Sequence, residues 1–255
     1  MHVHVPKPLH GWRAFFNEIF VIIIGVLIAL GLEQTVEAYH WHEKGELAQE
    51  AMRIEMLDDN APQLYIRLLI YPCLEQTEAG LLEHADTLPA SRLRDLAMQT
   101  GSPWNTFDSE AWKAVQSSDL ANHVDPEKLI QWSLPYRLMP SLSTMTAQEH
   151  MLQAELHTIL RPSGIPSQEE RAQLRRVAGQ LRTHNSTIAG LSLVAMQRLG
   201  QQKISLPEKT MLALERETRS QYGACVRHPN LSSDVYIPKV HNDAVISEIV
   251  DSIFR

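Results

Sequence analysis

The sequence has little of what marks a catalytic or nucleic-acid-binding protein. It contains no G-x-S-x-G or S-x-x-K motif and no CxxC pair, so common patterns for serine nucleophiles and thiol redox centres are missing. Its 255 residues carry 23 basic and 30 acidic side chains, for a formal net charge of -7, and no basic patch stands out. We therefore expect no nucleic-acid partner and no cofactor, and we do not favour an enzyme.

Long apolar runs are also scarce, with one exception near the N-terminus. From Ile19 to Leu32 no side chain is charged or strongly polar. A helix rises about 1.5 Å per residue, so the stretch 14–32 would cover roughly 28 Å, close to a bilayer core of about 30 Å. Trp12, just before the run, suits the membrane interface. We therefore predict a single-pass transmembrane anchor over residues 14–34.

Two other interpretations of this run stay open. Its length also fits the apolar region of a cleaved signal peptide, and Val36-Glu37-Ala38 has small residues where a cleavage site needs them. The acids at this site, and the helix-favouring sequence that continues through it, argue against cleavage. A buried core helix is the third interpretation, although buried helices seldom have so long an uninterrupted apolar run.

The charges on the two sides of the run predict its orientation. Residues 1–13 contain Lys7 and Arg13 and no acid, whereas residues 33–52 contain five glutamates and one lysine. Basic flanks stay in the cytoplasm. We therefore expect a cytoplasmic tail over 1–13 and place the bulk of the chain, 35–255, on the other side of the membrane.

Cysteine is rare, and both cysteines, Cys73 and Cys225, fall in the part expected outside the cytoplasm. In an oxidising compartment such a pair favours a disulfide. The alternative is two buried thiols that pack as small hydrophobic groups.

The rest of the chain shows no convincing period-two alternation, so we predict an all-α fold with several proline-kinked helices. The anchor helix should run on and end near Asp58-Asp59-Asn60, and Pro72 should bend or restart the next helix. Further helix starts are expected at Asp125-Pro126-Glu127, at Ser143 or Thr144 after a stop at Pro140, at the capping box Ser167 to Glu170, and at Asn242. Together these elements form a multi-helix bundle that continues from the transmembrane helix.

The motif FFNEIFVIIIGVLIALGLEQ resembles the N-terminal anchors of a group of uncharacterised bacterial membrane proteins, of the domain-of-unknown-function type. Their anchors read E-x6-G-V/I-L-I-A-L, and the matching positions begin here with Glu18 and Gly25. The resemblance implies a single-pass anchor in the bacterial inner membrane and a helical periplasmic domain. It implies no activity.

The sequence offers one candidate contact site in the membrane. Gly25 and Ala29 form a small-xxx-small pair on the same helical face as Glu18, a pattern that lets two membrane helices approach closely. The partner would be a second copy or another membrane protein. Because glycine and alanine are common in any membrane helix, an incidental pattern is equally open.

Other clusters point more to structure than to chemistry. The set Glu33, Glu37 and His40 and the set His150, Glu155 and His157 contain metal-ligating side chains, but we expect solvated surfaces and no metal site. We see no catalytic residue, since Cys225 near His228 is better used in a disulfide. Four aromatic residues favour core packing over a ligand cage: Trp104, Phe107, Trp112 and Trp132.

The sequence therefore predicts a membrane-anchored periplasmic protein that acts by protein–protein interaction or scaffolding, with the lipid bilayer as one partner. The alternative is a periplasmic subunit that senses a small ligand and signals through a separate partner. A hydrolase assembled from distant residues is the third hypothesis.

Overall fold

The computed structural model describes residues 11–231, and every regular element in that range is helical. Three short turns, η1 (Glu55–Asn60, a π-helix), η2 (Met98–Thr100) and η3 (Asp119–Asn122), accompany the α-helices. The α-helices are α1 (Trp12–Ile54), α2 (Ala61–His84), α3 (Ala90–Ala97), α4 (Glu110–Gln116), α5 (Pro126–Tyr136), α6 (Met139–Ile159), α7 (Gln168–Gln201) and α8 (Glu208–Tyr222). The all-α prediction is confirmed.

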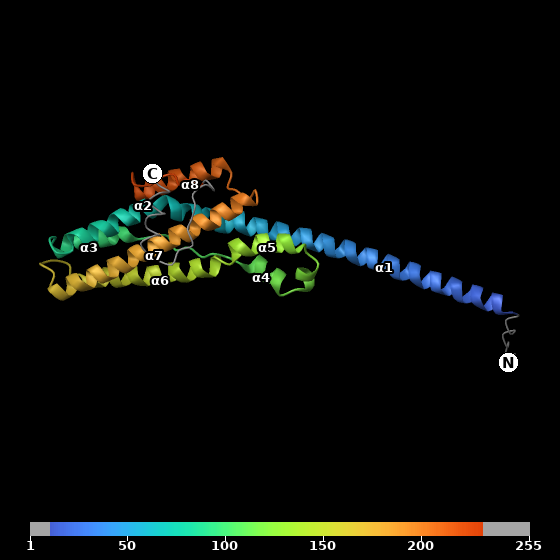
Figure 1. The fold of residues 1–255 in the computed structure, drawn as a ribbon. Helices are drawn as coiled ribbons and strands as arrows, with labels where there is room; N and C mark the ends of the chain where they lie inside the picture. Colours follow the sequence, from blue (N-terminus) through green and yellow to red (C-terminus); the bar gives the residue numbers. More distant parts are fainter. Residues whose placement is uncertain (1–10, 232–255) are drawn as a thin grey trace, which may run out of the picture.

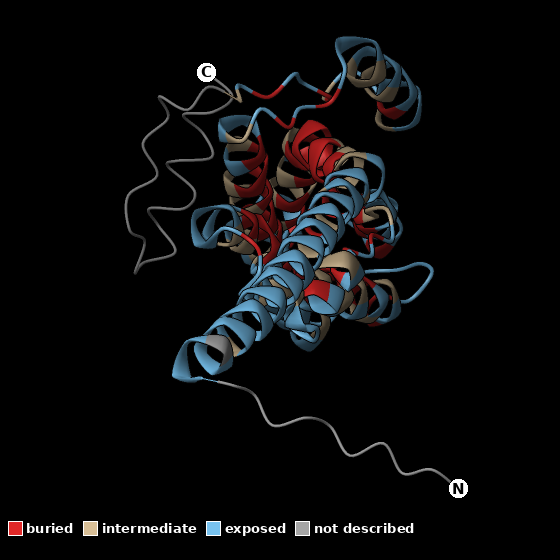
Figure 2. Cartoon of the chain, turned by 90° about the vertical axis from the view of Figure 1, so that its right-hand side faces the viewer, coloured by how far each residue is buried: buried red, intermediate tan, exposed pale blue. Residues whose placement is uncertain are grey.

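Helix α1 projects far beyond the rest of the molecule (Figure 1). It passes through η1 directly into α2, so that helix is continuous from Phe15 to His84. Its apolar half is exposed on all sides (Figure 2), and it is the one helix within residues 11–231 that is long and apolar enough to cross a membrane. A buried core helix is thereby ruled out for this run.

The body of the molecule is a bundle in which α2 packs against α7, α6 against α7, and α8 against α2. Its buried side chains form two apolar clusters. The proximal cluster lies toward α1 and includes Met52, Leu68, Tyr136 and Leu193. The distal cluster lies toward the far end and includes Leu81, Leu93, Leu156 and Leu181.

The predicted helix end at Asp58-Asp59-Asn60 is wrong. These residues lie in the π-helical turn η1, and Asn60 is helical and does not cap α2. Its amide instead reaches the loop before α4, where it donates to the Asp108 carbonyl and accepts from the Asp108 N–H, both at 2.9 Å. The Asn60 side chain thus makes a tertiary contact within a continuous helix, where a helix end was expected.

A helix restart at Pro72 and a helix stop at Pro140 were expected, and both are wrong. Helix α2 runs through Pro72, and residues on both sides of it, Tyr71 and Cys73 among them, are buried in the core. Packing of both halves therefore offsets the lost backbone hydrogen bond. Pro140 does not stop a helix but lies in the first turn of α6, where its missing N–H is unpaired in any case.

Two predicted helix starts are confirmed. The Asp125 side chain accepts a hydrogen bond from the Glu127 N–H at 2.9 Å, and Ser167 and Glu170 form a reciprocal capping box. The helix expected from Asn242 lies outside the described residues.

Candidate functional site

The predicted membrane contact residues Glu18, Gly25 and Ala29 lie on the exposed part of α1. An added Cβ on Gly25 would meet no atom within 4 Å. Their role in helix–helix contact stays a prediction, as does the anchor motif's resemblance to a family.

The predicted disulfide between Cys73 and Cys225 is present. It joins the middle of α2 to the segment after α8 and spans 152 residues of sequence. Thr218 is the one buried residue of α8, so the bridge is a major constraint on how the C-terminal end of this helix sits on α2.

A groove of about 620 Å³ opens beside the disulfide, between α2, the α3–η2 segment and the end of α8. Uncharged hydrogen-bonding groups from Gln76, Thr77 and Gln99 line it together with apolar surface from Met98 and Tyr222. None of the described residues that line it is a carboxylate, a lysine or an arginine, and a single histidine, His84, lies at its wall. Its size is within the range of small-molecule sites, and its lining suits a polar, uncharged molecule.

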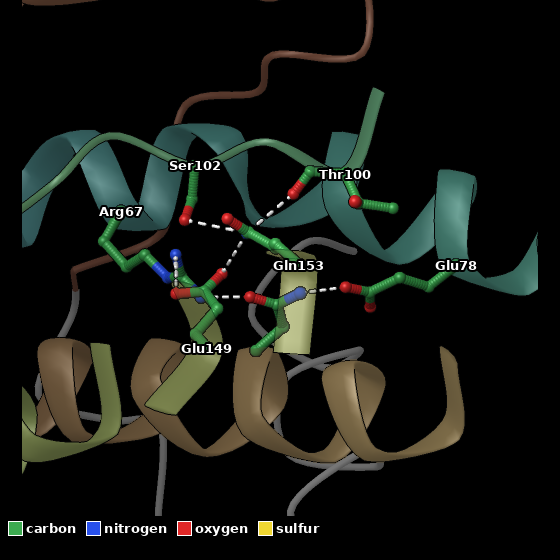
Figure 3. A network of polar contacts seen from close by, with 7 residues as sticks. Arg67, Glu78, Thr100, Ser102, Glu149 and Gln153 are labelled. Atoms are coloured by element: carbon green, nitrogen blue, oxygen red, sulfur yellow. Dashed lines mark hydrogen bonds and ion pairs between the residues drawn. The ribbon is translucent and has the colours of Figure 1, made fainter. Parts of the chain in front are cut away.

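The most elaborate polar arrangement in the described bundle is buried between α2, α6 and α7, and we call it the buried polar layer (Figure 3). The guanidinium of Arg67 pairs with both carboxylate oxygens of Glu149, at 2.9 and 3.0 Å, and donates to the side-chain oxygen of Asn185. The amide of Asn185 in turn donates to Glu78. Gln153 connects Glu149 to the loop after α3 through the Thr100 carbonyl, at 2.8 Å, and the Ser102 hydroxyl.

This layer separates the two apolar clusters. On α7, distal-cluster residues end at Leu181 and proximal-cluster residues begin at Ile188, with Asn185 between them. On α6, Glu149 lies between Leu142 and Leu156 in the same way. The ion pair and hydrogen bonds of this layer form only when the three helices align, so the layer specifies their register: sliding α2 or α6 would leave a charge unpaired in the core, and sliding α7 would break the hydrogen bonds of Asn185. The layer is not fully satisfied, since Arg67 Nε and one carboxyl oxygen of Glu78 have no hydrogen-bond partner among the described residues.

The buried polar layer contains one more acidic than basic side chain. The positive charge of Arg67 offsets Glu149, and both are at least 99% buried. Ionised Glu78 would add a second buried anion. Desolvation therefore raises the pKa of Glu78 to about 8, against the lowering effects of Arg67 and of the hydrogen bond from Asn185. At neutral pH this carboxyl is mostly protonated, which keeps the layer close to electrically neutral.

A second set of tertiary polar contacts lies around the π-helical turn η1, where α1 enters the body. The N–H of Ala111 donates to Glu55 at 3.0 Å, and the Tyr136 hydroxyl donates to the Met52 carbonyl at 3.1 Å. Burial raises the pKa of Tyr136, and the nearby carboxylate of Glu55 raises it further. These bonds, with those of Asn60, fix the direction in which α1 leaves the bundle.

The remaining sequence candidates are not brought together as ligand sets. His150 stacks on Trp104, His157 lies 3.2 Å from the Ala97 carbonyl, and Glu155 pairs with Arg176. Within residues 11–231 no group of three or more His, Cys, Asp or Glu could hold a metal ion.

The aromatic prediction is partly right. Phe107 and Trp132 are buried, and Trp112 packs against the proximal cluster, but Trp104 is 68% exposed. His228 contacts the hydroxyl of Tyr65 at 3.0 Å, and Cys225 is in the disulfide.

The sequence interpretation missed the buried polar layer. A signal was available in two places: Arg67 interrupts the apolar run LYIRLLIY, and Glu78 lies among small and apolar residues. Nothing in the sequence paired these residues with Glu149 or Asn185. Comparisons of the chain with protein families, curated proteins and solved structures find no match.

Proposed function

We propose that this chain is a single-pass membrane protein of the bacterial inner membrane that holds a rigid helical body in the periplasm and acts by binding other proteins. The observation that carries the proposal is that none of the described side chains in the apolar half of α1 is buried. Soluble monomers rarely leave so large a continuous apolar surface in water, and a bilayer would cover it.

The dimensions of α1 support an anchored body. Contacts between α1 and the body begin at Trp41, which stacks on His123 with ring centroids 4.1 Å apart. From Leu32 at the end of the apolar run to Trp41 the helix rises about 14 Å. That distance is longer than the headgroup layer is thick, so the body would lie just outside the membrane. We call the helical segment between the apolar run and the body, residues 33–40, the stalk.

The orientation rests on two further features. The stalk is rich in glutamate, which suits the non-cytoplasmic side, and the Cys73–Cys225 disulfide suits an oxidising compartment. The most buried titratable groups, those of the buried polar layer, hold the helices in register. This structural role supports a binding protein over an enzyme.

Crosslinking in intact membranes, followed by mass spectrometry of the attached chains, tests this function. Crosslinks to one or two defined foreign proteins are the expected result. An intact mass that lacks the first ~38 residues would show a cleaved signal peptide and overturn the anchor. A protein that crosslinks to no other chain would overturn the scaffolding role.

The groove beside the disulfide favours a second candidate, a subunit that senses a small uncharged ligand. Gly80 lines this groove, and a Cβ there would meet no atom within 4 Å, so Gly80→Trp would fill the space. Native mass spectrometry of the purified protein should then show a bound small molecule in the wild type and none in Gly80→Trp. Identical spectra would remove this candidate.

A further inference from the structure

The Cys73–Cys225 disulfide forms part of the wall of the groove between α2, η2 and α8. Both cysteines line the groove, and on their other side both pack against the proximal cluster. Cys73 is buried, with 6% of its surface exposed, whereas Cys225 is half-buried. The bond therefore faces solvent through the groove, and Cys225 is the more accessible partner.

The groove has the space and the lining for a small reductant. Its volume is about 620 Å³, and none of the described residues that line it is an acid that would repel a thiolate. Gln76 on α2 and Gln221 on α8 have side-chain N–H groups that can donate to a sulfur anion. Thiol–disulfide exchange requires that a thiolate reach one of the two sulfurs, and this lining permits its approach.

The walls of the groove are held in different ways. The α2 wall belongs to the core of the bundle. The η2 wall is tied to α6 by Gln153, which donates to the Thr100 carbonyl at 2.8 Å and to the Ser102 hydroxyl at 3.1 Å. The third wall is the end of α8, whose one buried residue is Thr218 and whose covalent tie to α2 is the disulfide. Loss of the bond would release this wall and leave the other two in place.

We propose that the groove is a thiol–disulfide exchange site through which a small dithiol opens the Cys73–Cys225 bond, and that a molecule filling the groove shields the bond. The shielding rests on the proposed ligand-sensing function. A ligand that contacts all three walls binds the oxidised form better, so occupancy of the groove and the redox state of the bond depend on each other.

The dithiol alone balances the exchange. One of its thiolates attacks the sulfur of Cys225, the S–S bond breaks, and Cys73 leaves as a thiolate. The second thiolate then attacks the reductant's sulfur in the mixed disulfide and displaces Cys225. The dithiol ends as a cyclic disulfide, and the two protons it has lost end on the two cysteines.

Reduction of the full chain in detergent by dithiothreitol tests the site. Gln76→Trp and Gln221→Trp fill the groove from two walls, and Glu83→Trp and Ser220→Trp are matched controls at exposed positions of the same helices outside the lining. Alkylation of the freed thiols and intact mass measurement give the rate. We expect reduction about tenfold slower in the two groove variants and at the wild-type rate in both controls.

The wild type provides a second measurement that needs no variant. Direct attack predicts a reduction rate that rises in proportion to the dithiothreitol concentration. A rate independent of concentration would show that the bond is reduced only after local unfolding, and would overturn the proposal. Wild-type rates in both groove variants, or equal slowing in all four tryptophan variants, would also overturn it.

Hydrogen exchange tests whether reduction releases one wall. Exchange in the segment 219–225 should speed up on reduction, and exchange in 98–102 should not change. Unchanged exchange in 219–225 would overturn the mutual dependence, because the buried Val226 would then hold the wall without the bond. Native mass spectra without a bound molecule would remove the ligand-sensing function and leave these reduction rates as they are. Wild-type reduction rates in the groove variants would remove the exchange site and leave the anchor standing.

Discussion

Glu78 shows how one residue makes the stability of this bundle depend on pH. Its pKa in the folded protein is about 8, above the ordinary value of 4.5, so the folded state binds more protons than the unfolded state between these two values. The free energy of unfolding should therefore fall as pH rises from about 4.5 to 8, by up to about 1.4 kcal/mol per pH unit.

Glu78→Gln should remove this dependence, because glutamine resembles the neutral carboxyl and can still accept from Asn185. We expect the variant to melt at a similar temperature to the wild type near pH 5 and at a higher temperature near pH 8. Circular dichroism melts across this range would measure it. Glu83→Gln, on the exposed surface of the same helix, is the control that should keep the wild-type slope. Parallel slopes for wild type and Glu78→Gln would contradict the assignment.

Arg67 is the second residue whose replacement should be costly. Arg67→Met would leave Glu149 buried without its counter-charge, and breaking a buried pair in this way costs about 3–5 kcal/mol. Urea unfolding should show this loss, and the double variant Arg67→Met/Glu149→Leu should recover much of it, because no buried charge is then unpaired. A double variant less stable than the single one would argue against this explanation.

Among the elements, α8 depends most on a covalent constraint. Its main packing partner is α2, and the disulfide fixes the segment that follows it. Reduction, or the variant Cys73→Ser/Cys225→Ser, should free α8 to detach, and the chain-entropy estimate puts the loss at up to about 5 kcal/mol.

Limited trypsin digestion provides the readout for α8. Lys203 is exposed in the connection between α7 and α8 and has a positive φ of 61°. Cleavage there should accelerate when the disulfide is reduced, while sites in α7 stay protected. Equal cleavage rates with and without reductant would show that packing alone holds α8.

The π-helical turn is the element that sets the direction of α1. Asn60→Ala removes two hydrogen bonds to the Asp108 backbone and should cost about 1–3 kcal/mol. Hydrogen exchange of the segment 101–109 should speed up in this variant. Asp59→Ala, on the exposed side of the same turn, is the control and should leave exchange unchanged.

At the scale of the whole molecule, the body should fold without the apolar half of α1. Contacts from α1 to the body begin near Trp41, so a variant that lacks residues 1–38 keeps them. We expect a soluble, helical protein whose melting temperature is close to that of the full chain in detergent. Aggregation or a large loss of helix would show that the first half of α1 supports the fold.

Local sequence patterns predicted the elements that depend on nearest neighbours. The capping box at Ser167, the cap at Asp125 and the apolar run of α1 all act over a few residues, and each was predicted correctly. The helix boundaries at Asn60, Pro72 and Pro140 were wrong, because contacts distant in sequence compete there with local signals.

The sequence by itself determined the all-α class and the long apolar helix near the N-terminus, and it favoured the pairing of the two cysteines, since each follows from composition and spacing along the chain. Only the tertiary structure decided that Arg67, Glu149, Asn185 and Glu78 form one buried layer, and that α1 is continuous with the core helix α2. The physical reason is that a charge between two apolar clusters is tolerated only with its partner, and that partner lies 82 residues away.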